Sequence, residues 1–312
     1  MRSSGNRPEV SVVVASFSGA EILADCLDGL ARQVPETPRF EVVVVSTLGT
    51  GTTESLERRF ASLEMRFVSA PVGTDVFALR ARGVEQCRGR RIVLTEDHTV
   101  ATRRWLVAFE EADPRAEQIA GGPIEPHGEA RGSELGLLLC EYGFYLPPWR
   151  LGPTAALSGL NLAYPRQLLE DCLVAWQGGL RENEVNDILR ARGYYLHGVP
   201  EAVVTSRLRM IGNEARAHLY SGGKHFGRYR KASLGPPLRW LLPLAGPAVP
   251  MVLTARLIRR VVRRGSPWVR RLPAALPSIL GLIAAWSAGE IQGYWMPTTP
   301  LEPDGPPQGV VQ

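Results

Sequence analysis

The first hundred residues alternate between two kinds of segment, and this alternation limits the fold more than any other feature of the sequence. Residues 10–17 (VSVVVASF), 40–47 (FEVVVVST) and 90–97 (RRIVLTED) begin with the β-branched apolar runs of strands that are buried on both faces. Between them, residues 19–33 and 75–87 carry apolar side chains at helical spacing. Strand and helix in this order predict βαβ units, and therefore an α/β domain with a mostly parallel sheet and flanking helices.

Three ionisable residues stand at the end of the strand expected at 90–97. Glu96, Asp97 and His98 directly follow its apolar run. Ligands of open α/β sheets bind at the carboxyl ends of the strands. A carboxylate is a hard oxygen ligand for Mg²⁺ or Mn²⁺, and an imidazole suits Mn²⁺ better than Mg²⁺. The cluster therefore predicts a ligand site, and a solvated strand end is the alternative.

The last third of the chain has a different character. Residues 240–255 and 272–289 carry no charge. The first segment is short for a membrane crossing, which takes about 20 apolar residues, and the second contains Pro273 and Pro277. We expect both segments to be re-entrant or interfacial, with a hairpin of two spans as the alternative. The loop expected between them holds the arginines that would contact anionic headgroups: Arg256, Arg259, Arg260, Arg263, Arg264, Arg270 and Arg271.

Cysteine spacing and charge indicate the compartment. The four cysteines are widely separated, with no CxxC pair, which favours reduced thiols over a disulfide framework or a zinc site. Residues 1–10 lack the apolar core of a signal peptide, so we expect no secretion. The net charge of +5 reflects arginines beyond residue 205 that alternate with apolar segments, a pattern that favours a membrane surface and not nucleic acid. The expected location is the cytoplasmic face of the cell membrane.

Five segments resemble, in order, those of the family 2 glycosyltransferases, which have the Rossmann-like GT-A fold. They are VSVVVASFSGAEILADCLDGLARQ, EVVVVSTLGTGTTESL, ALRARGVEQCRGRRIVLTEDHTVATRRWL, SGLNLAYPRQLLEDC and ENEVNDILRARGY. The resemblance implies a nucleotide-sugar donor and a divalent cation. It also implies the residues that bind the donor: Ala15, Ser16, Phe17, Ser46, Thr47, Arg80, Glu96 and Asp97.

The chain departs from the family's pattern at three places. Glu96 and His98 occupy the two outer positions of the family's D-x-D metal motif, counted back from Trp105, and this change favours Mn²⁺ over Mg²⁺. The neutral Ser46 or Thr47 stands where the family usually has an Asp that reads the nucleotide base. The family's Arg-Asn pair is Arg80-Ala81 here, and Arg80 keeps the capacity to bind phosphate.

The resemblance also places an acceptor side. Glu182 occupies the family's usual position for the base, counted back from Gly193, and Glu184 is the alternative base or an orienting group. A base on the side of the sugar opposite to the leaving diphosphate gives inversion by direct displacement. Two acidic residues in a first helical turn are also explained by the helix dipole alone. Trp149, in an aromatic loop, and Asn161 are expected on the acceptor side.

The sequence therefore predicts a GT-A glycosyltransferase domain at 8–210, a basic amphipathic connector at 211–235, membrane-associated segments at 236–296 and a disordered tail at 297–312. Its predicted function is sugar transfer to a lipid-linked or envelope-polysaccharide acceptor. The altered motifs keep an inactive binding or scaffold subunit on the same fold as an alternative. A nucleotidyltransferase fits less well, since residues 15–21 (ASFSGAE) contain no lysine or arginine.

Overall fold

The computed structural model describes residues 7–207, 210, 212–233 and 246–296. The chain divides into two compact units. The first comprises Met1–His127 and Pro147–Arg207, and the second comprises Gly128–Leu146 and Leu208–Gln312. The excursion of Gly128–Leu146 into the second unit has no signal in the sequence pattern. The tail expected at 297–312 and the start of the apolar segment expected at 240–255 lie outside the described residues.

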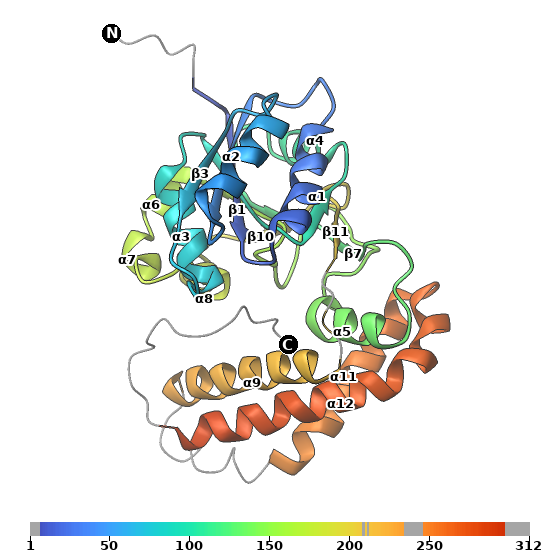
Figure 1. Cartoon of the computed structure of the whole chain (residues 1–312). Helices are drawn as coiled ribbons and strands as arrows, with labels where there is room; N and C mark the ends of the chain where they lie inside the picture. The colour runs from blue at the N-terminus through green and yellow to red at the C-terminus, as the bar shows by residue number, and fades with distance from the viewer. Residues whose placement is uncertain (1–6, 208–209, 211, 234–245, 297–312) are drawn as a thin grey trace. The chain divides into compact units, whose positions relative to one another are not determined.

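A mixed eight-stranded sheet forms the centre of the first unit, in the order β3-β2-β1-β4-β9-β6-β10-β8 (Figure 1). Four neighbouring strands, β3, β2, β1 and β4, are mutually parallel, as the alternating pattern predicts. β9 then runs antiparallel to both β4 and β6. The strands are β1 (Val10–Ser16), β2 (Phe40–Ser46), β3 (Met65–Ser69), β4 (Arg91–Glu96), β6 (Ile119–Gly121), β8 (Gly152–Pro153), β9 (Leu162–Pro165) and β10 (Leu196–Gly198).

Helices connect and cover these strands. They are α1 (Ala20–Ala31), α2 (Thr50–Arg59), α3 (Val76–Gln86), α4 (Trp105–Ala112), α6 (Arg166–Glu170), α7 (Leu173–Trp176) and α8 (Glu182–Ala191). α3 starts at a side-chain cap, because Asp75 Oδ1 accepts a hydrogen bond from Ala78 N at 2.8 Å. It packs closely on β1, since a Cβ at Gly83 would lie 2.4 Å from Val13 Cγ1, closer than van der Waals contact allows. The predicted α/β class is confirmed.

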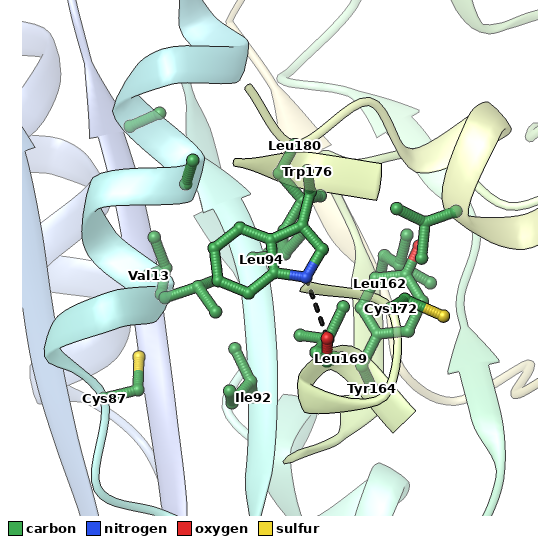
Figure 2. Packing of buried hydrophobic residues seen from close by; sticks show 14 of the residues in the cluster. Val13, Cys87, Ile92, Leu94, Leu162, Tyr164, Leu169, Cys172, Trp176 and Leu180 are labelled. Atoms are coloured by element: carbon green, nitrogen blue, oxygen red, sulfur yellow. Dashed lines mark hydrogen bonds between the residues drawn. The ribbon is translucent and has the colours of Figure 1, made fainter. Parts of the chain in front are cut away.

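The core between α3, α6, α7 and the sheet is apolar except for a few satisfied polar atoms (Figure 2). Val13, Leu94 and Leu162, from three strands, are fully buried there. The indole of Trp176 lies against them, and its Nε1 donates to Leu169 O at 2.8 Å. A buried indole N–H needs such a partner, so this bond fixes the short α6–α7 segment on the core.

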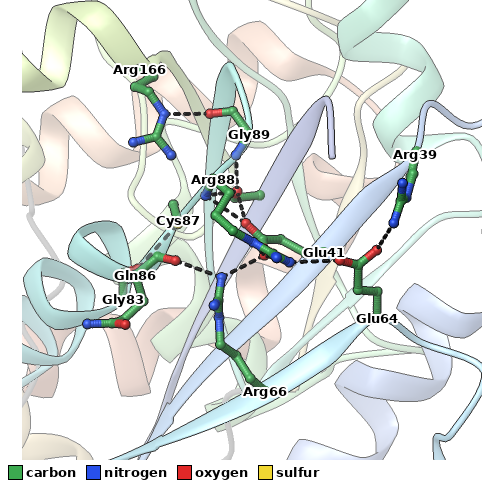
Figure 3. A network of polar contacts seen from close by, with 11 residues as sticks. Arg39, Glu41, Glu64, Arg66, Gly83, Gln86, Cys87, Arg88, Gly89 and Arg166 are labelled. Atoms are coloured by element: carbon green, nitrogen blue, oxygen red, sulfur yellow. Dashed lines mark hydrogen bonds and ion pairs between the residues drawn. The ribbon is translucent and has the colours of Figure 1, made fainter. Parts of the chain in front are cut away.

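A polar network holds the amino-terminal ends of the parallel strands (Figure 3). Its centre is Glu41 of β2, whose carboxylate accepts hydrogen bonds from Ser11 Oγ at 2.7 Å and from Arg88 N at 2.7 Å. The guanidinium groups of Arg66 and Arg88 donate to the other carboxylate oxygen at 2.6 and 2.8 Å. Glu64 of β3 accepts from Arg88 as well. The network ties β1, β2, β3 and the loop before β4 together at the edge opposite to the strands' carboxyl ends.

A second, three-stranded sheet has the order β5-β11-β7, with β5 (Thr99–Ala101), β7 (Ile124–Pro126) and β11 (Val204–Ser206). β11 is antiparallel to β5 and parallel to β7. The chain after β11 stays beside the end of β4, because Arg207 N donates to His98 O at 2.7 Å. The short strands β10 and β11 lie on either side of a turn within residues 194–208.

The second unit is helical. Its elements are α5 (Gly132–Tyr142), α9 (Asn213–Ser233), the 3-10 helix η2 (Gly246–Ala248), α11 (Val249–Arg264) and α12 (Trp268–Trp295). α9 and α12 pack backbone against backbone through a glycine pair on each helix. A Cβ at Gly223 or Gly227 of α9 would collide with the α12 backbone, and one at Gly289 or Gly293 would collide with the α9 backbone. Only glycine permits this close approach.

The prediction that these arginines lie in a loop is wrong. Arg256, Arg259, Arg260, Arg263 and Arg264 lie inside α11, and Arg270 and Arg271 lie in the first turn of α12. Their spacing and the flanking aliphatic residues continue a helical pattern, which the boundaries of the uncharged segments do not reveal. Among the described helices, one, α12, has the length and apolar composition that a membrane crossing requires. The expectation of apolar C-terminal helices is thus confirmed for this helix.

Candidate active site

The carboxyl ends of β1, β2 and β4 meet at one edge of the large sheet. Register places Ser16 beside Ser46 and Ala15 beside Glu96. Phe17 and Thr47, which follow the first two strands, are partly exposed. The sequence-predicted donor residues are therefore brought together, as parallel strand ends require.

The Asp97 side chain binds the loop that follows β1. Its Oδ2 accepts hydrogen bonds from Phe17 N and Ser18 N, both at 2.7 Å, and its Oδ1 accepts one from Ser18 Oγ at 2.8 Å. The residue is fully buried. A carboxylate that accepts backbone N–H groups in this way fixes a loop. Asp97 thus shapes the turn that carries Phe17, one of the expected donor residues.

Arg80 of α3 joins the end of β4 to the start of α8. Its Nη2 pairs with Glu96 Oε1, and its Nη1 donates to Glu182 Oε2 at 2.7 Å. The side chains of Arg80 and Glu96 are each 3% exposed, and that of Glu182 is 14% exposed. Burial lowers the pKa of the Arg80 guanidinium, but the charges of Glu182 and Glu96 outweigh burial and raise it above its ordinary value. Arg80 is therefore a permanent cation between two carboxylates.

Gly159 completes this arrangement. A Cβ at this position would lie 2.5 Å from the Arg80 guanidinium carbon, so a larger residue would displace that group. Gly159 N also donates to Glu182 Oε1 at 3.3 Å. The backbone at Gly159 thus contacts both members of the Arg80–Glu182 pair. The sequence motif SGLNL contains this glycine, but nothing in its pattern indicates a close approach to Arg80.

His98 lies beside the second oxygen of Glu96. The distance from His98 Nδ1 to Glu96 Oε2 is 3.6 Å, and the distance to Asp97 Oδ1 is 3.8 Å. The Phe17 ring packs near the imidazole, with centroids 6.0 Å apart. Within the described residues, no three His, Cys, Asp or Glu side chains form a group that could hold a metal ion. The structure thus brings the two outer residues of the predicted metal motif, Glu96 and His98, close to each other.

The first turn of α8 carries the second acidic candidate. Glu184 is partly buried and lies 3.9 Å from Arg181 Nε. Burial raises the pKa of the Glu184 carboxyl, the nearby Glu182 charge adds to the rise, and Arg181 opposes it. Arg181 and Arg80 both lie over the Phe77 ring, at 4.7 and 5.7 Å from its centroid. The sequence pattern gave no reason to single out Phe77 or Arg181.

The structure does not bring Asn161 to an open surface. Its side chain is fully buried, its Oδ1 accepts from Trp105 Nε1 at 2.8 Å, and its Nδ2 donates to Pro123 O and Ala202 O. These bonds hold α4 and two loops in place. Trp149 is partly exposed and packs at the carboxyl end of β10, where a Cβ at Gly198 would meet its ring at 3.0 Å.

Comparison with known proteins agrees with this geometry. A family model described as glycosyl transferase family 2 matches residues 11–169, just over half of the chain, from β1 into α6. That match includes Arg80, Glu96 and His98, whereas Glu182 lies beyond it. No curated protein sequence matches the chain.

Solved structures resemble most of the chain at low sequence identity. A mannosyltransferase from Pyrobaculum calidifontis, in complex with GDP-Man and Mn²⁺, has a TM-score of 0.58 at 18% identity and covers 93% of this chain and 88% of that chain. S. aureus TarS 1-349 with UDP-GlcNAc has a TM-score of 0.52 at 13% identity and covers 92% and 89%. GalNAc-T7 with UDP, GalNAc and Mn²⁺ has a TM-score of 0.50 at 15% identity and covers 67% and 45%. These likenesses show that the fold is GT-A.

Proposed function

The chain belongs to glycosyl transferase family 2, and from that premise we propose that it moves a sugar from a nucleotide donor to a lipid-linked or envelope-polysaccharide acceptor, with inversion. The observation that carries this proposal is the buried chain Glu96–Arg80–Glu182. It joins the strand end that corresponds to the family's metal motif to the helix that carries the expected base. Arg80 therefore contacts both the proposed donor side and the proposed acceptor side of the site.

The donor is a nucleoside diphosphate sugar. Support comes from the strand ends that carry Ala15, Ser16, Phe17, Ser46 and Thr47, which meet Glu96 at one edge. Related folds were solved with GDP-Man and with UDP-GlcNAc, so a nucleotide sugar of either kind is consistent with this architecture. Ser46 Oγ already accepts from Leu48 N at 3.1 Å, which shapes the turn after β2. The partly exposed Thr47 is therefore the better candidate for a hydroxyl contact with the base.

Glu96 and His98 would hold the divalent cation, and the imidazole favours Mn²⁺ over Mg²⁺. When bound, the ion neutralises charge that develops on the leaving diphosphate. Two of the similar structures contain Mn²⁺. Glu96 Oε1 is engaged by Arg80, while Oε2 faces His98. The second oxygen is thus the one that this chain offers to a metal.

Glu182 is the proposed base for the acceptor hydroxyl. Its carboxylate sits at the first residue of α8, held by Arg80 and by Gly159 N, so its position is fixed before substrate binds. Glu184 is the alternative base, since burial raises the pKa of its carboxyl above the ordinary value and so makes it a stronger base. Trp149 would contact the acceptor, as its partly exposed ring at the end of β10 allows.

The second unit supports a membrane-bound acceptor. The charged Glu290 of α12 is buried, where Tyr294 Oη and Arg230 Nη1 bond its carboxylate at 2.6 and 3.3 Å. The exposed positions of α12 after its first turn are, by contrast, uncharged: Pro273, Ala274, Pro277, Leu280, Ala284, Ala288, Gln292 and Trp295. A helix in water has the opposite arrangement. This face suits lipid.

The same unit favours an interfacial position over a full crossing. α9, which packs along α12, exposes charged residues such as Glu214, Arg216 and Arg230. These would be costly in the hydrocarbon core. The exposed arginines of α11, such as Arg259 and Arg263, suit anionic headgroups. We place the unit at the cytoplasmic face, where nucleotide sugars occur, and the four free buried cysteines agree with a reducing compartment.

A catalytically inactive binding subunit on the same fold is the second candidate. One observation favours it: Arg80 pairs with the metal-motif glutamate and with the expected base at the same time. An enzyme must release or share that arginine during turnover.

The decisive experiment is a thermal-shift screen of the purified chain with UDP-, GDP- and dTDP-sugars, with and without Mn²⁺. We expect stabilisation by one nucleotide class that increases with Mn²⁺. Glu182→Gln should then lower turnover by a factor of about 100 or more, while donor affinity falls by no more than about tenfold. If the parent binds a nucleotide but shows no turnover when acceptor-rich membrane extracts are added, that result would support the inactive subunit. No binding of any of these nucleotides would refute the proposed function.

A further inference from the structure

Three elements that are distant in sequence converge on one guanidinium group. Glu96 ends β4, Arg80 lies in α3, and Glu182 starts α8. Two different nitrogens of Arg80 bond the two carboxylates, and no part of this chain of contacts is more than 14% exposed. A charge buried in this way interacts strongly with its partners, because little water screens it.

Two neighbours, Phe77 and Gly159, confine the Arg80 guanidinium group. The Phe77 ring is on one side, 5.7 Å from the guanidinium carbon to the ring centroid. The Gly159 backbone is on another side, and it admits the group only because it has no Cβ. Lysine would not reproduce this arrangement, since its ammonium is a point charge without the planar fork that reaches two acids at once.

The two carboxylate oxygens that Arg80 does not bond have different neighbours. Glu96 Oε2 lies 3.6 Å from His98 Nδ1, on the proposed metal side. Glu182 Oε1 accepts from Gly159 N at 3.3 Å, on the proposed acceptor side. Among the described contacts, Arg80 is the group that bonds both glutamates. Any change of charge at one glutamate therefore changes how strongly Arg80 holds the other.

We propose that Arg80 is a positioning residue that couples the two sides of the site, so that occupation of the Glu96 side alters the charge balance at Glu182, and the reverse. This inference rests on the proposed function. Coupling of two binding equilibria is reciprocal by thermodynamic necessity. A substitution of Glu182 should therefore change the affinity for a metal–nucleotide complex, although Glu182 is not itself proposed to contact the metal.

The test is a double-mutant cycle on affinity. Isothermal titration calorimetry with UDP and with GDP, each with Mn²⁺, measures the dissociation constant for the full chain, Glu182→Gln, Arg80→Gln and the double variant. In the parent background Glu182→Gln should weaken binding by a factor of about 2 to 10, because Arg80 then acts on Glu96 alone and competes with the cation. In the Arg80→Gln background the same substitution should leave the dissociation constant unchanged.

Two controls match the chemistry. Asp187→Asn removes a carboxylate from the same helix, where Asp187 forms an ion pair with Arg190, and Arg82→Gln removes an arginine from α3 two residues beyond Arg80. Neither should change the effect of Glu182→Gln. If Arg80→Gln does not fold, as judged by circular dichroism and thermal unfolding, Arg80→Lys replaces it. Lysine keeps one positive charge but lacks the planar fork whose two nitrogens bond the two acids separately, so the effect of Glu182→Gln should still shrink at least about twofold.

The outcomes separate the two proposals. A parent protein that binds neither nucleotide refutes the proposed function. A parent that binds, but in which Glu182→Gln has no effect or the same effect with and without Arg80, refutes the coupling and leaves the glycosyltransferase assignment in place. Merely structural support by Arg80 would lower the melting temperature of its variants without making the effect of Glu182→Gln depend on residue 80.

Discussion

Glu41 anchors the amino-terminal edge of the sheet, and its replacement by glutamine should destabilise the protein without removing any group from the proposed site. Glutamine keeps a carbonyl oxygen for Ser11 and Arg88 N but presents an N–H₂ group to the guanidinium groups of Arg66 and Arg88. Two charge-assisted hydrogen bonds are then lost, each with a typical worth of about 1.5–3 kcal/mol.

The size of the effect follows from exposure. The Glu41 side chain is 2% exposed, but those of Arg66 and Arg88 are 36% and 46% exposed, so water can solvate the two guanidinium groups after the change. We therefore take the low end, a loss of about 3 kcal/mol of unfolding free energy, or about 6 to 12 °C in melting temperature. Urea unfolding followed by tryptophan fluorescence measures the free energy, and calorimetry measures the melting temperature.

Glu64→Gln is the matched control, because its carboxylate binds Arg88 and Arg39 but is 37% exposed. It should cost about 0.5 kcal/mol or less. Equal losses for Glu41→Gln and Glu64→Gln would refute the reasoning, since burial would then make no difference to the worth of the network.

The pH dependence gives an independent test. Burial by itself raises the pKa of the Glu41 carboxyl, but hydrogen bonds from Ser11 and Arg88 and the charge of Arg66 outweigh burial and hold the pKa below its ordinary value of 4.5. The stabilisation is therefore fully present above pH 4.5 and is lost as the pH falls through the lower folded-state value. The gap between parent and Glu41→Gln should stay constant from neutral pH to about pH 5 and narrow below it. A gap that widens in acid would contradict this sign.

Three further predictions concern single contacts. Asp97→Asn should cost about 2–3 kcal/mol, because its amide N–H₂ would oppose donors of the β1–α1 loop such as Ser18 N, and hydrogen exchange of that loop should rise locally. Gly227→Ala should cost about 1–3 kcal/mol of unfolding free energy by forcing α9 away from the α12 backbone, and thermal unfolding followed by circular dichroism measures this loss. Ala217→Gly, on the exposed side of α9, should cost about 1 kcal/mol. Trp176→Phe should cost about 1–3 kcal/mol in urea unfolding, since Leu169 O loses its indole partner and the smaller ring leaves a void, and an unchanged midpoint would contradict that account.

The class of the fold and one edge of the site follow from the order of the amino acids. Short uninterrupted valine runs are typical of strands buried on both faces, and helices between them favour a parallel arrangement. Parallel strands bring their carboxyl ends together, so the residues that follow β1, β2 and β4, including Ser16, Ser46 and Glu96, had to meet. The order of five segments was enough to indicate the family that the family model then matched.

Sequence patterns were weaker where amphipathic and uncharged segments alternate. The arginines between the two apolar segments were expected in a loop, yet Arg256 to Arg264 continue the helix α11. Charge alone does not end a helix, because arginine is a good helix former and its repeats there follow the helical period. The close approach of α9 and α12 through Gly223 and Gly289 depends on where two helices cross, which no local pattern specifies.

The contacts of each polar residue in the site depend on tertiary packing. Glu96, Asp97 and His98 are adjacent in sequence, but their side chains have different partners. Asp97 accepts hydrogen bonds from the β1–α1 turn, whereas Glu96 pairs with Arg80. Arg80 meets Glu182 across a separation of 102 residues, and it can do so only because Gly159 has no side chain. Local sequence sets periodicity and burial, whereas a hydrogen-bond partner is chosen by whichever distant group the packed backbone brings within about 3 Å.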